Sequence, residues 1–257
     1  MQYKDQISRI IDLPATPQRI ISLVPSQTEL LIDLGLQSSL VGLTKFCVHP
    51  SNIRYEKTIV GGTKQVNYDK IKSLQPDLII CNKEENTQEI VENLSANYKV
   101  WVSDISTIEE SIEMIEAIGF ICDTSIKAKE ICEGIKLEKE LFLEFTQDKP
   151  TMQTAYLIWK DPYMVAGKNT FINTLLDLNK FQNAFVNSAS RYPEIQLEEL
   201  KNLDIILLSS EPFPFKDLHI KLIKEHTRAQ VLLVDGEYFS WYGSRLQKAF
   251  RYFRTLH

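Results

Sequence analysis

Residues 19–30 read Arg-Ile-Ile-Ser-Leu-Val-Pro-Ser-Gln-Thr-Glu-Leu, and this stretch decides the fold class. Its first half is an apolar run that ends at Pro25. Because proline cannot donate to a central β-ladder, the run predicts a short buried strand. Ser26 and Glu29 have the spacing of a capping box and predict a helix that continues to about Gly35. A strand followed directly by a helix is the repeating unit of an α/β fold.

Strand and helix patterns alternate along the rest of the chain. Alternation of this kind predicts an α/β architecture with mostly parallel sheets. The apolar runs predict strands at residues 40–43, 77–81, 98–102, 153–159, 204–208 and 230–234. Helices are expected near residues 67–74, 86–96, 107–118, 169–178 and 215–226, near residue 196 and from residue 241 onward.

Residues 123–147 lie between two similar halves and predict one long helix. They contain no proline and only one glycine, Gly134, and their apolar residues recur at near-helical spacing. Some 25 helical residues would reach roughly 37 Å, about the width of a small domain. We therefore expect two Rossmann-like lobes, residues 1–122 and 150–257, joined by a long backbone helix over residues 123–149.

A weak internal repeat favours the two-lobe interpretation. Residues 69–74 and the strand that follows them resemble residues 198–203 and their own strand. Each segment begins with an acid, Asp69 in the first and Glu198 in the second, near the start of a short helix. Such an acid is also favourable with the helix dipole alone, so chance recurrence is the other interpretation.

Charge and cysteine usage exclude several classes of protein. Lys plus Arg number 29 and Asp plus Glu number 34, which gives a net charge of −5, and no dense basic run occurs. This balance argues against nucleic-acid binding. The polar N-terminus does not have the pattern of an export leader, and no apolar run is long enough to span a bilayer. The cysteines have no zinc or disulfide spacing, so buried free thiols are expected at Cys47, Cys81, Cys122 and Cys132.

Catalytic signatures are scarce. The sequence has no glycine-rich nucleotide loop, no Gly-x-Ser-x-Gly motif and no His-Glu-x-x-His motif. Cys47 and His49 form the one close thiol and imidazole pair. His49 could belong to a nucleophilic pair, hydrogen-bond or coordinate a ligand in a cleft, or lie on the surface. His219 and His226 are expected to be solvated on an amphipathic helix.

Aromatic residues gather in loops that follow predicted strands. Trp159 ends one strand, and residues 238–245 follow another and include Trp241, Tyr242 and Arg245. Ligands of open parallel sheets bind beyond the carboxyl ends of the strands. These loops therefore predict a flat apolar wall with one cationic group, suited to a large planar or anionic ligand. In the alternative interpretation, Trp241 and Tyr242 pack the C-terminal helix onto its lobe.

These segments together resemble a known family. Residues 19–30, 41–42, 49–50, 60–63 and 67–80 look, in that order, like the substrate-binding proteins of ABC importers for cobalamin, iron-siderophores and haem. Their shared unit is the helical-backbone metal receptor domain. The resemblance implies the class III periplasmic-binding-protein fold, with two α/β lobes, one rigid connecting helix and the ligand between the lobes.

The resemblance also implies roles for particular residues. Asp69 and Glu198 match the acids that dock on the permease, although glutamate is usual where Asp69 stands. Thr63 and Lys64 replace a tryptophan-bearing stretch of the cobalamin binders, so another metal chelate is an open alternative. Ligand contacts are implied at Pro25, Ser26, Phe46, His49, Thr63, Lys64, Trp159, Tyr192, Trp241, Tyr242 and Arg245.

The sequence thus predicts a protein that is not an enzyme and has no intrinsic cofactor. It would bind a metal-containing chelate, which is cobalamin or another corrinoid, an iron-siderophore or haem, and deliver it as a monomer to an ABC permease and ATPase. The family location is periplasmic, but no signal peptide is present in this chain, which leaves a cytoplasmic location as the alternative. Two other hypotheses are a cytoplasmic enzyme or sensor that uses Cys47 and His49, and a scaffold that binds a partner protein through its acidic faces.

Overall fold

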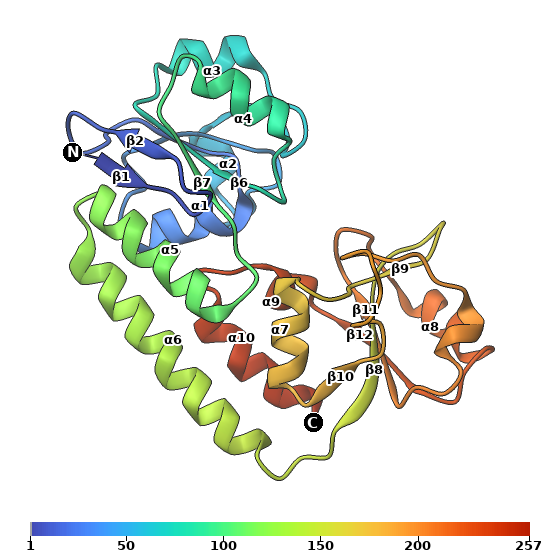
Figure 1. Ribbon diagram of the computed structural model, residues 1–257. Coiled ribbons are helices and arrows are strands. Elements are labelled where there is room, and N and C mark those ends of the chain that lie inside the picture. The colour runs from blue at the N-terminus through green and yellow to red at the C-terminus, as the bar shows by residue number, and fades with distance from the viewer. Residues whose placement is uncertain (1) are drawn as a thin grey trace. The chain divides into compact units, whose positions relative to one another are not determined.

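The structure is a computed structural model that describes residues 2–257, and the chain divides into two compact units (Figure 1). Unit 1 comprises the residues up to Ile105 together with Glu109–Lys136 and Tyr242–Leu246. Unit 2 comprises Ser106–Ile108, Leu137–Trp241 and Gln247–His257. Each unit has its own sheet and its own core, as expected for the predicted two-lobe α/β fold.

Unit 1 is built on a five-stranded parallel sheet with the order β5-β4-β3-β6-β7. Figure 1 shows α3 and α4 on one face of this sheet and α1 and α5 on the other. The elements are β3 (Ile20–Ser22), α1 (Pro25–Asp33), β4 (Leu40–Leu43), α2 (Ile53–Glu56), β5 (Thr58–Ile59), α3 (Tyr68–Leu74), β6 (Leu78–Asn82), α4 (Gln88–Ser95), β7 (Val100–Ser103) and α5 (Ile108–Ile121). The fully buried strand residues Ile21, Ile79 and Cys81 pack with Ile71 of α3 and Leu94 of α4.

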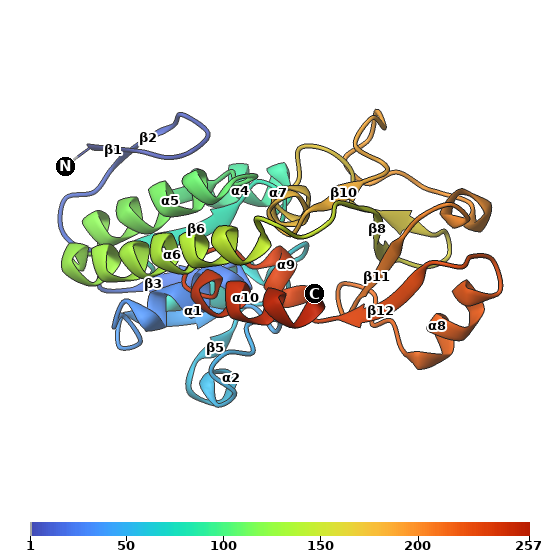
Figure 2. The same ribbon diagram turned by 90° about the horizontal axis from the view of Figure 1, so that it is seen from below.

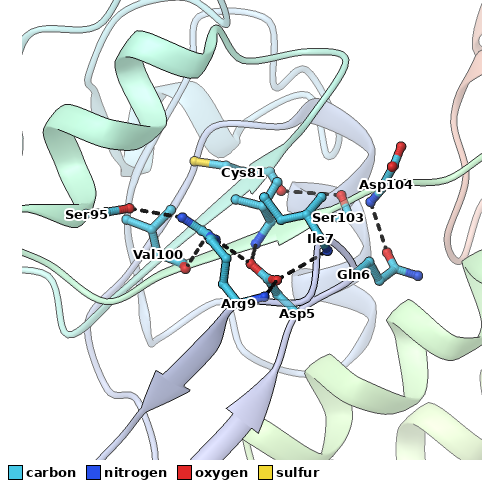
Figure 3. A network of polar contacts seen from close by, with 10 residues as sticks. Asp5, Gln6, Ile7, Arg9, Cys81, Ser95, Val100, Ser103 and Asp104 are labelled. Atoms are coloured by element: carbon cyan, nitrogen blue, oxygen red, sulfur yellow. Dashed lines mark hydrogen bonds and ion pairs between the residues drawn. The ribbon is translucent and has the colours of Figure 1, made fainter.

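A short N-terminal hairpin that the sequence did not indicate adjoins this sheet. Its strands are β1 (Gln2–Lys4) and β2 (Ile10–Asp12), paired antiparallel, and the loop between them lies along the edge strand β7 (Figure 3). The buried Asp5 carboxylate accepts from the amides of Ile7, Arg9 and Val102 at 3.2, 2.7 and 3.3 Å. Arg9 donates to the Val100 carbonyl oxygen at 2.8 Å. Because these groups satisfy backbone atoms of β7, the hairpin loop covers an edge that would otherwise be open.

Unit 2 repeats the parallel design with the strand order β10-β8-β11-β12, and β9 pairs antiparallel with β8. Its elements are β8 (Met152–Trp159), β9 (Met164–Val165), α7 (Phe171–Leu178), β10 (Phe181–Asn183), η1 (Leu197–Leu200), β11 (Ile205–Ser209), α8 (Asp217–Lys224), β12 (Gln230–Val234), α9 (Gly236–Ser240), α10 (Leu246–Phe253) and η2 (Arg254–Leu256). Figure 1 shows α8 on one face of the sheet, with α7, α9 and α10 on the other. Leu157, Ile206 and Val231 of the strands pack with Leu200 and Ile223.

The predicted long helix is present as α6 (Ser125–Thr146), which has 22 residues and is seen along its side in Figure 2. Its length is about 33 Å at the rise of an α-helix. Residues up to Lys136 belong to unit 1, and those from Leu137 onward belong to unit 2. The helix is therefore a continuous part of both units.

The internal repeat has a structural counterpart in both sheets. In unit 1, Asp77 precedes β6, and its carboxylate accepts from the amides of Gln18 and Arg19 just before β3. In unit 2, Asp204 precedes β11 and accepts from the Gln153 amide of β8 at 2.7 Å. Each aspartate thus fixes the start of the neighbouring strand. A helix-strand pattern that recurred by chance would not need to share this contact, so the contact favours a true repeat.

Three local predictions were wrong. Helix α1 begins at Pro25 with Val24 as its N-cap and no side-chain cap, because proline at the first helical position needs no amide partner. Ser26 therefore lies inside the helix, and the Ser26 and Glu29 capping box does not form. Trp241 is the C-cap of α9, which ends at Ser240, and the last α-helix begins only at Leu246. His219 is buried, and its Nδ1 accepts from the Lys216 amide at 2.8 Å, so it is not the solvated residue expected.

Candidate functional site

The carboxyl ends of the unit 1 strands carry a buried polar network. At the ends of β6 and β7, the Asn82 amide donates to the Ser103 carbonyl and hydroxyl at 3.1 and 3.0 Å. Gln27 of α1 also donates to the Ser103 hydroxyl. Asn82 accepts from the amides of Glu84 and Glu85 at 2.8 and 3.0 Å, which fixes the loop after β6. The hydrogen bonds made by Asn82 and Ser103 hold the ends of β6 and β7 together, whereas Gln27 is bonded through its nitrogen and its Oε1 is buried without a hydrogen-bond partner.

The loop after β4 contains the thiol and imidazole pair. Cys47 is fully buried, and its Sγ lies 3.1 Å from the Thr28 hydroxyl and 3.3 Å from the Thr44 hydroxyl. Burial raises the pKa of the Cys47 thiol, so the reactive thiolate is disfavoured. His49 is half-buried. The other cysteines are also free and buried, as expected.

The remaining unit 1 residues expected at the ligand differ in exposure. Pro25 is half-buried and Ser26 is buried at the start of α1. Phe46 is 48% exposed, and the ammonium group of Lys45 lies 5.0 Å from its ring centre. Thr63 is buried, and its carbonyl accepts from Asn86 at 2.9 Å. The ammonium group of Lys64 donates to the Glu84 carbonyl at 2.6 Å. Phe46 is thus the exposed aromatic side chain of this group.

Tyr242 and Arg245 belong to unit 1, although sequence reasoning placed them on the C-terminal lobe. The Arg245 guanidinium donates to both carboxylate oxygens of Glu29 at 2.7 and 3.1 Å, and both side chains are buried. Arg245 therefore joins its segment to α1 instead of presenting an unpaired cation. Gly243 has a φ of +97° and donates to the Ser111 hydroxyl at 3.0 Å, which turns the chain toward α5. Burial raises the pKa of Tyr242.

The carboxyl ends of the unit 2 strands carry a row of aromatic rings. Trp159 ends β8 and is 41% exposed, and its ring meets Phe213 edge to face at 5.8 Å between ring centres. Phe213 meets Phe215 at 4.8 Å, and the His219 ring lies 5.4 Å from both phenylalanines. The Lys160 ammonium group pairs with Asp161 at 2.6 Å beside this row. The rings are steeply inclined to one another, and Phe215 and His219 are buried, so Trp159 is the ring of this row that offers an exposed apolar face beyond the carboxyl end of its strand.

A hollow of about 530 Å³ lies beside the aromatic row, at the ends of β11 and β12. Ser210, Glu211, Phe215, Leu233, Val234, Asp235 and Glu237 line it. Glu211 Oε1 accepts from Trp241 Nε1 at 2.8 Å and from the Ser240 hydroxyl at 2.6 Å. Burial raises the pKa of Glu211, and the charges of Glu237 and Asp235 add to this effect. Trp241 itself is 7% exposed, so it supports the rim through its indole N–H.

Sequence reasoning missed Glu211, Phe213 and Phe215. The segment Ser-Ser-Glu-Pro-Phe-Pro-Phe at residues 209–215 follows a predicted buried strand, and its alternating prolines and aromatics were a readable signal for a rim loop. Tyr192, in contrast, was expected at the ligand. It is half-buried in the loop before η1, and its amide donates to Ser190 at 3.1 Å.

The two acids expected to dock on a permease occupy equivalent positions. Asp69 is exposed in the first turn of α3, which leads to β6. Glu198 is exposed in the first turn of η1, which leads to β11. Within residues 2–257, no group of three or more His, Cys, Asp or Glu side chains is arranged to hold a metal ion. No helix among these residues has the length and apolar character needed to cross a membrane.

Comparison with protein families gives one match over most of the chain. The model of the family described as periplasmic binding protein matches residues 20–230. The vitamin B12-binding protein of Photorhabdus laumondii is 26% identical over 242 residues, which cover 91% of this chain and 86% of that relative.

Solved structures of similar fold include binders of two macrocycles. The periplasmic vitamin B12-binding protein BtuF of Vibrio cholerae superposes with a TM-score of 0.81 at 20% identity, covering 94% of this chain and 97% of that one. The periplasmic haem-binding protein HutB of Vibrio cholerae gives a TM-score of 0.79 at 22% identity, covering 93% of this chain and 99% of that one. At these identities the likeness concerns the fold.

Proposed function

This chain belongs to the periplasmic binding protein family, and from that premise we propose that it carries a metal-containing chelate to an ABC importer. The observation that carries the proposal is the aromatic row of Trp159, Phe213 and Phe215 beside the 530 Å³ hollow. Planar macrocycles bind well to aromatic faces, since each ring covers a large apolar area without an extended polar network.

Among chelates, we propose a corrinoid of the cobalamin type as the first ligand to test, and haem or an iron-siderophore as the other members of the class. A relative named as a vitamin B12-binding protein spans 91% of the chain, which supports this order. The chelate is cargo in this proposal, and it arrives with its metal already coordinated. Lack of a cluster of metal-ligating side chains within residues 2–257 is compatible with such a cargo.

Ligand contacts are proposed within each unit. In unit 1 they are His49, Lys64 and the exposed ring of Phe46, and in unit 2 they are the rim around Trp241 and the loop of Tyr192. Arg245 contributes indirectly, because its bonds to Glu29 fix the segment that carries Tyr242. Binding would need no covalent chemistry at any of these residues.

The family consists of binding proteins, and the chain's chemistry agrees with that role. Cys47, the nucleophile of the enzyme hypothesis, is buried with its thiol bonded to Thr28 and Thr44. The raised pKa of Cys47 keeps the sulfur protonated at neutral pH. An enzyme or sensor that depends on a Cys47 thiolate is therefore not supported.

We further propose that Asp69 and Glu198 dock the loaded protein on basic pockets of the permease. Both acids are exposed, and each stands in the first turn of a helix that leads to a central strand of its unit. Their equivalent positions in a repeated design suit recognition by two similar permease subunits. This role places the protein on the extracytoplasmic side of the membrane, and we propose that it acts there as a monomer.

The test is a titration of the purified protein with cyanocobalamin, haemin and a ferric siderophore, followed by visible absorbance and calorimetry. At least one ligand should shift its absorbance and release heat at a one-to-one ratio. Trp159→Ala should weaken that binding roughly tenfold, since it removes one exposed aromatic face. Phe120→Ala, which removes a still more exposed ring from α5, should leave binding unchanged. No response to any of the three ligands would contradict the proposal.

A further inference from the structure

Glu211 has a feature that a simple apolar binding wall does not need. Its carboxylate lies on the rim of the unit 2 hollow, beside the apolar side chains of Phe215, Leu233 and Val234. Moving a carboxylate from water to such a position costs free energy unless it has partners. Glu211 has two partners, Trp241 Nε1 at 2.8 Å and the Ser240 hydroxyl at 2.6 Å, both on Oε1.

The backbone around Glu211 is arranged to bring its carboxylate to this place. The Ser209 hydroxyl donates to the Glu211 carbonyl at 2.5 Å, and the Tyr156 hydroxyl donates to Ser209 at 3.1 Å. Gly236 N donates to the Ser210 hydroxyl at 2.9 Å. A Cβ added to Gly236 would lie 2.7 Å from the Glu211 Cγ, so a larger residue would displace the glutamate. The side chain is therefore held from β11 and from the start of α9.

The charges that line the hollow all have one sign. Asp235 and Glu237 also line it, and their charges contribute to the raised pKa of Glu211. The described residues of the lining include no Lys, Arg or His. The cation at the end of β8, Lys160, is paired with Asp161 at 2.6 Å, and Lys216 next to Phe215 is exposed. A ligand that rests on the aromatic row thus meets acceptors and negative charge on this side.

We propose that Glu211 determines which chelates this protein accepts, favouring ligands whose rim carries N–H donors and no negative charge over ligands whose rim carries carboxylates. This inference rests on the proposed function and narrows its substrate class. An amide-decorated macrocycle would donate to the carboxylate rim, whereas a ligand carboxylate would face like charge in a partly desolvated site. Specificity would arise largely from repulsion between a ligand carboxylate and Glu211, since the apolar ring of either kind of ligand makes similar contacts.

Two matched pairs of ligands distinguish the effect of charge at the ligand rim from the effect of the kind of ring. Dicyanocobinamide and dicyanocobyrinic acid share one corrin ring, but the first has an amide rim and the second a carboxylate rim. Haemin dimethyl ester and haemin share one porphyrin and differ in their free carboxylates. Dissociation constants for both pairs are measured by absorbance titration at about pH 8, where carboxylates are ionised.

Wild-type protein should bind the uncharged member of the responding pair more tightly. Glu211→Gln should reduce that preference roughly fivefold, since Gln keeps an oxygen that can accept from Trp241 but has no charge. Glu225→Gln is the matched control. It removes an equal charge from unit 2 at the end of α8, before β12 begins, and should leave the preference unchanged.

The possible results decide between the two proposals. If ligands bind and their preference is the same in wild type, Glu211→Gln and Glu225→Gln, the inference about Glu211 is wrong and the binding function stands. If neither pair binds to wild type, the inference is overturned, and if the ferric siderophore of the first titration does not bind either, the proposed function is wrong as well. If Glu211→Gln does not fold, Glu237→Gln is measured instead, because it removes another charge from the same lining. It should also reduce the preference for the uncharged ligand. An unchanged preference in Glu237→Gln would then overturn the inference.

Discussion

The buried ion pair between Glu29 and Arg245 joins two segments of unit 1 that lie far apart in the sequence. Its side chains are 216 positions apart in sequence, and both guanidinium bonds lie within 3.1 Å. Neither charge is accessible to much water, because the side chains are only 9% and 7% exposed. A buried pair of this kind adds little net stability, but removing one partner leaves an isolated buried charge.

Arg245→Met should therefore destabilise the protein by about 3 kcal/mol, because Glu29 would remain buried without its cation. Urea unfolding followed by far-ultraviolet circular dichroism measures the change. Lys127→Met is the matched control, since Lys127 pairs with Glu130 and their side chains are 54% and 59% exposed. That exposed pair is screened by water, so its loss should change stability little. Equal losses in the two variants would contradict the burial argument.

Glu211 should make folding stability depend on pH in a defined direction. Its folded pKa is raised above the ordinary value of 4.5, mainly by burial, so the folded state holds this proton at pH values where the unfolded state has released it. Stability from this group is therefore present below pH 4.5 and is lost as pH rises through the folded pKa.

Glu211→Gln should consequently lose stability less steeply than wild type as pH rises from 4.5 toward neutral. Urea unfolding curves of both proteins, collected across that range, give the difference in slope. Glu225→Gln serves again as the control because no comparable burial surrounds it. Parallel curves for wild type and Glu211→Gln would show that the Glu211 pKa is not raised.

Single residues also mark where sequence reasoning succeeds and fails. Asn67 was predicted to begin a helix, and its side chain does accept from the Lys70 amide at 2.9 Å. Ser26 was given the same role from the same kind of pattern and fails, because Pro25 begins the helix one residue earlier. The Glu29 carboxylate instead accepts hydrogen bonds from Arg245. A local pattern predicts a cap when no distant partner competes, and a partner 216 positions away has no local signature.

At the scale of elements, the N-terminal hairpin depends on one carboxylate. The Asp5 oxygens accept four donors: the amides of Ile7, Arg9 and Val102 and the Arg9 Nε. Gln6 adds a bond from its amide to the Val102 carbonyl at 3.2 Å. These contacts attach the loop between β1 and β2 to β7, and Tyr3 meets Phe120 of α5 at 5.7 Å between ring centres.

Asp5→Asn should detach this hairpin while the rest of unit 1 stays folded. The new amide group would face backbone donors, so at least one bond is lost at a cost of about 2 kcal/mol. Hydrogen exchange followed by mass spectrometry should then show faster exchange in β1, β2 and β7. Asp33→Asn, an equal charge change at an exposed position of α1, should leave exchange unaltered. Unchanged protection in Asp5→Asn would mean that the strand pairing alone holds the hairpin.

Element lengths explain which parts of the fold were predictable. Strands β6, β8 and β11 have five or more residues and buried apolar runs, so their patterns are unambiguous. Strands β1, β2, β5 and β9 have only two or three residues, which is too short for an apolar pattern to identify a strand. Helix α6 was predictable within three residues at each end because a long run without proline has few other stable conformations.

At the scale of the whole molecule, two units share one plan but differ at their carboxyl edges. The unit 1 edge has paired amides and hydroxyls, from Gln27 to Ser103, with Phe46 exposed beside them. The unit 2 edge has the aromatic row and the carboxylate of Glu211. The common framework followed from the repeated apolar pattern. The carboxyl edges were less predictable, because their side chains come from loops. The order of these loops along the chain does not indicate which side chains contact one another.

Because the two units repeat one design, substitution of the equivalent aspartate in each unit should loosen the sheet of that unit alone. Asp77→Ala removes the carboxylate that anchors Gln18 and Arg19, and Asp204→Ala removes the carboxylate that anchors Gln153. Each loss should cost about 1 kcal/mol, since both aspartates are exposed and their bonds compete with water. Hydrogen exchange should increase in β3 and β6 for the first variant and in β8 and β11 for the second, so each protein is the control for the other. If either variant loosened both sheets equally, the two units would unfold as one cooperative body, and the repeat would have no independent structural meaning.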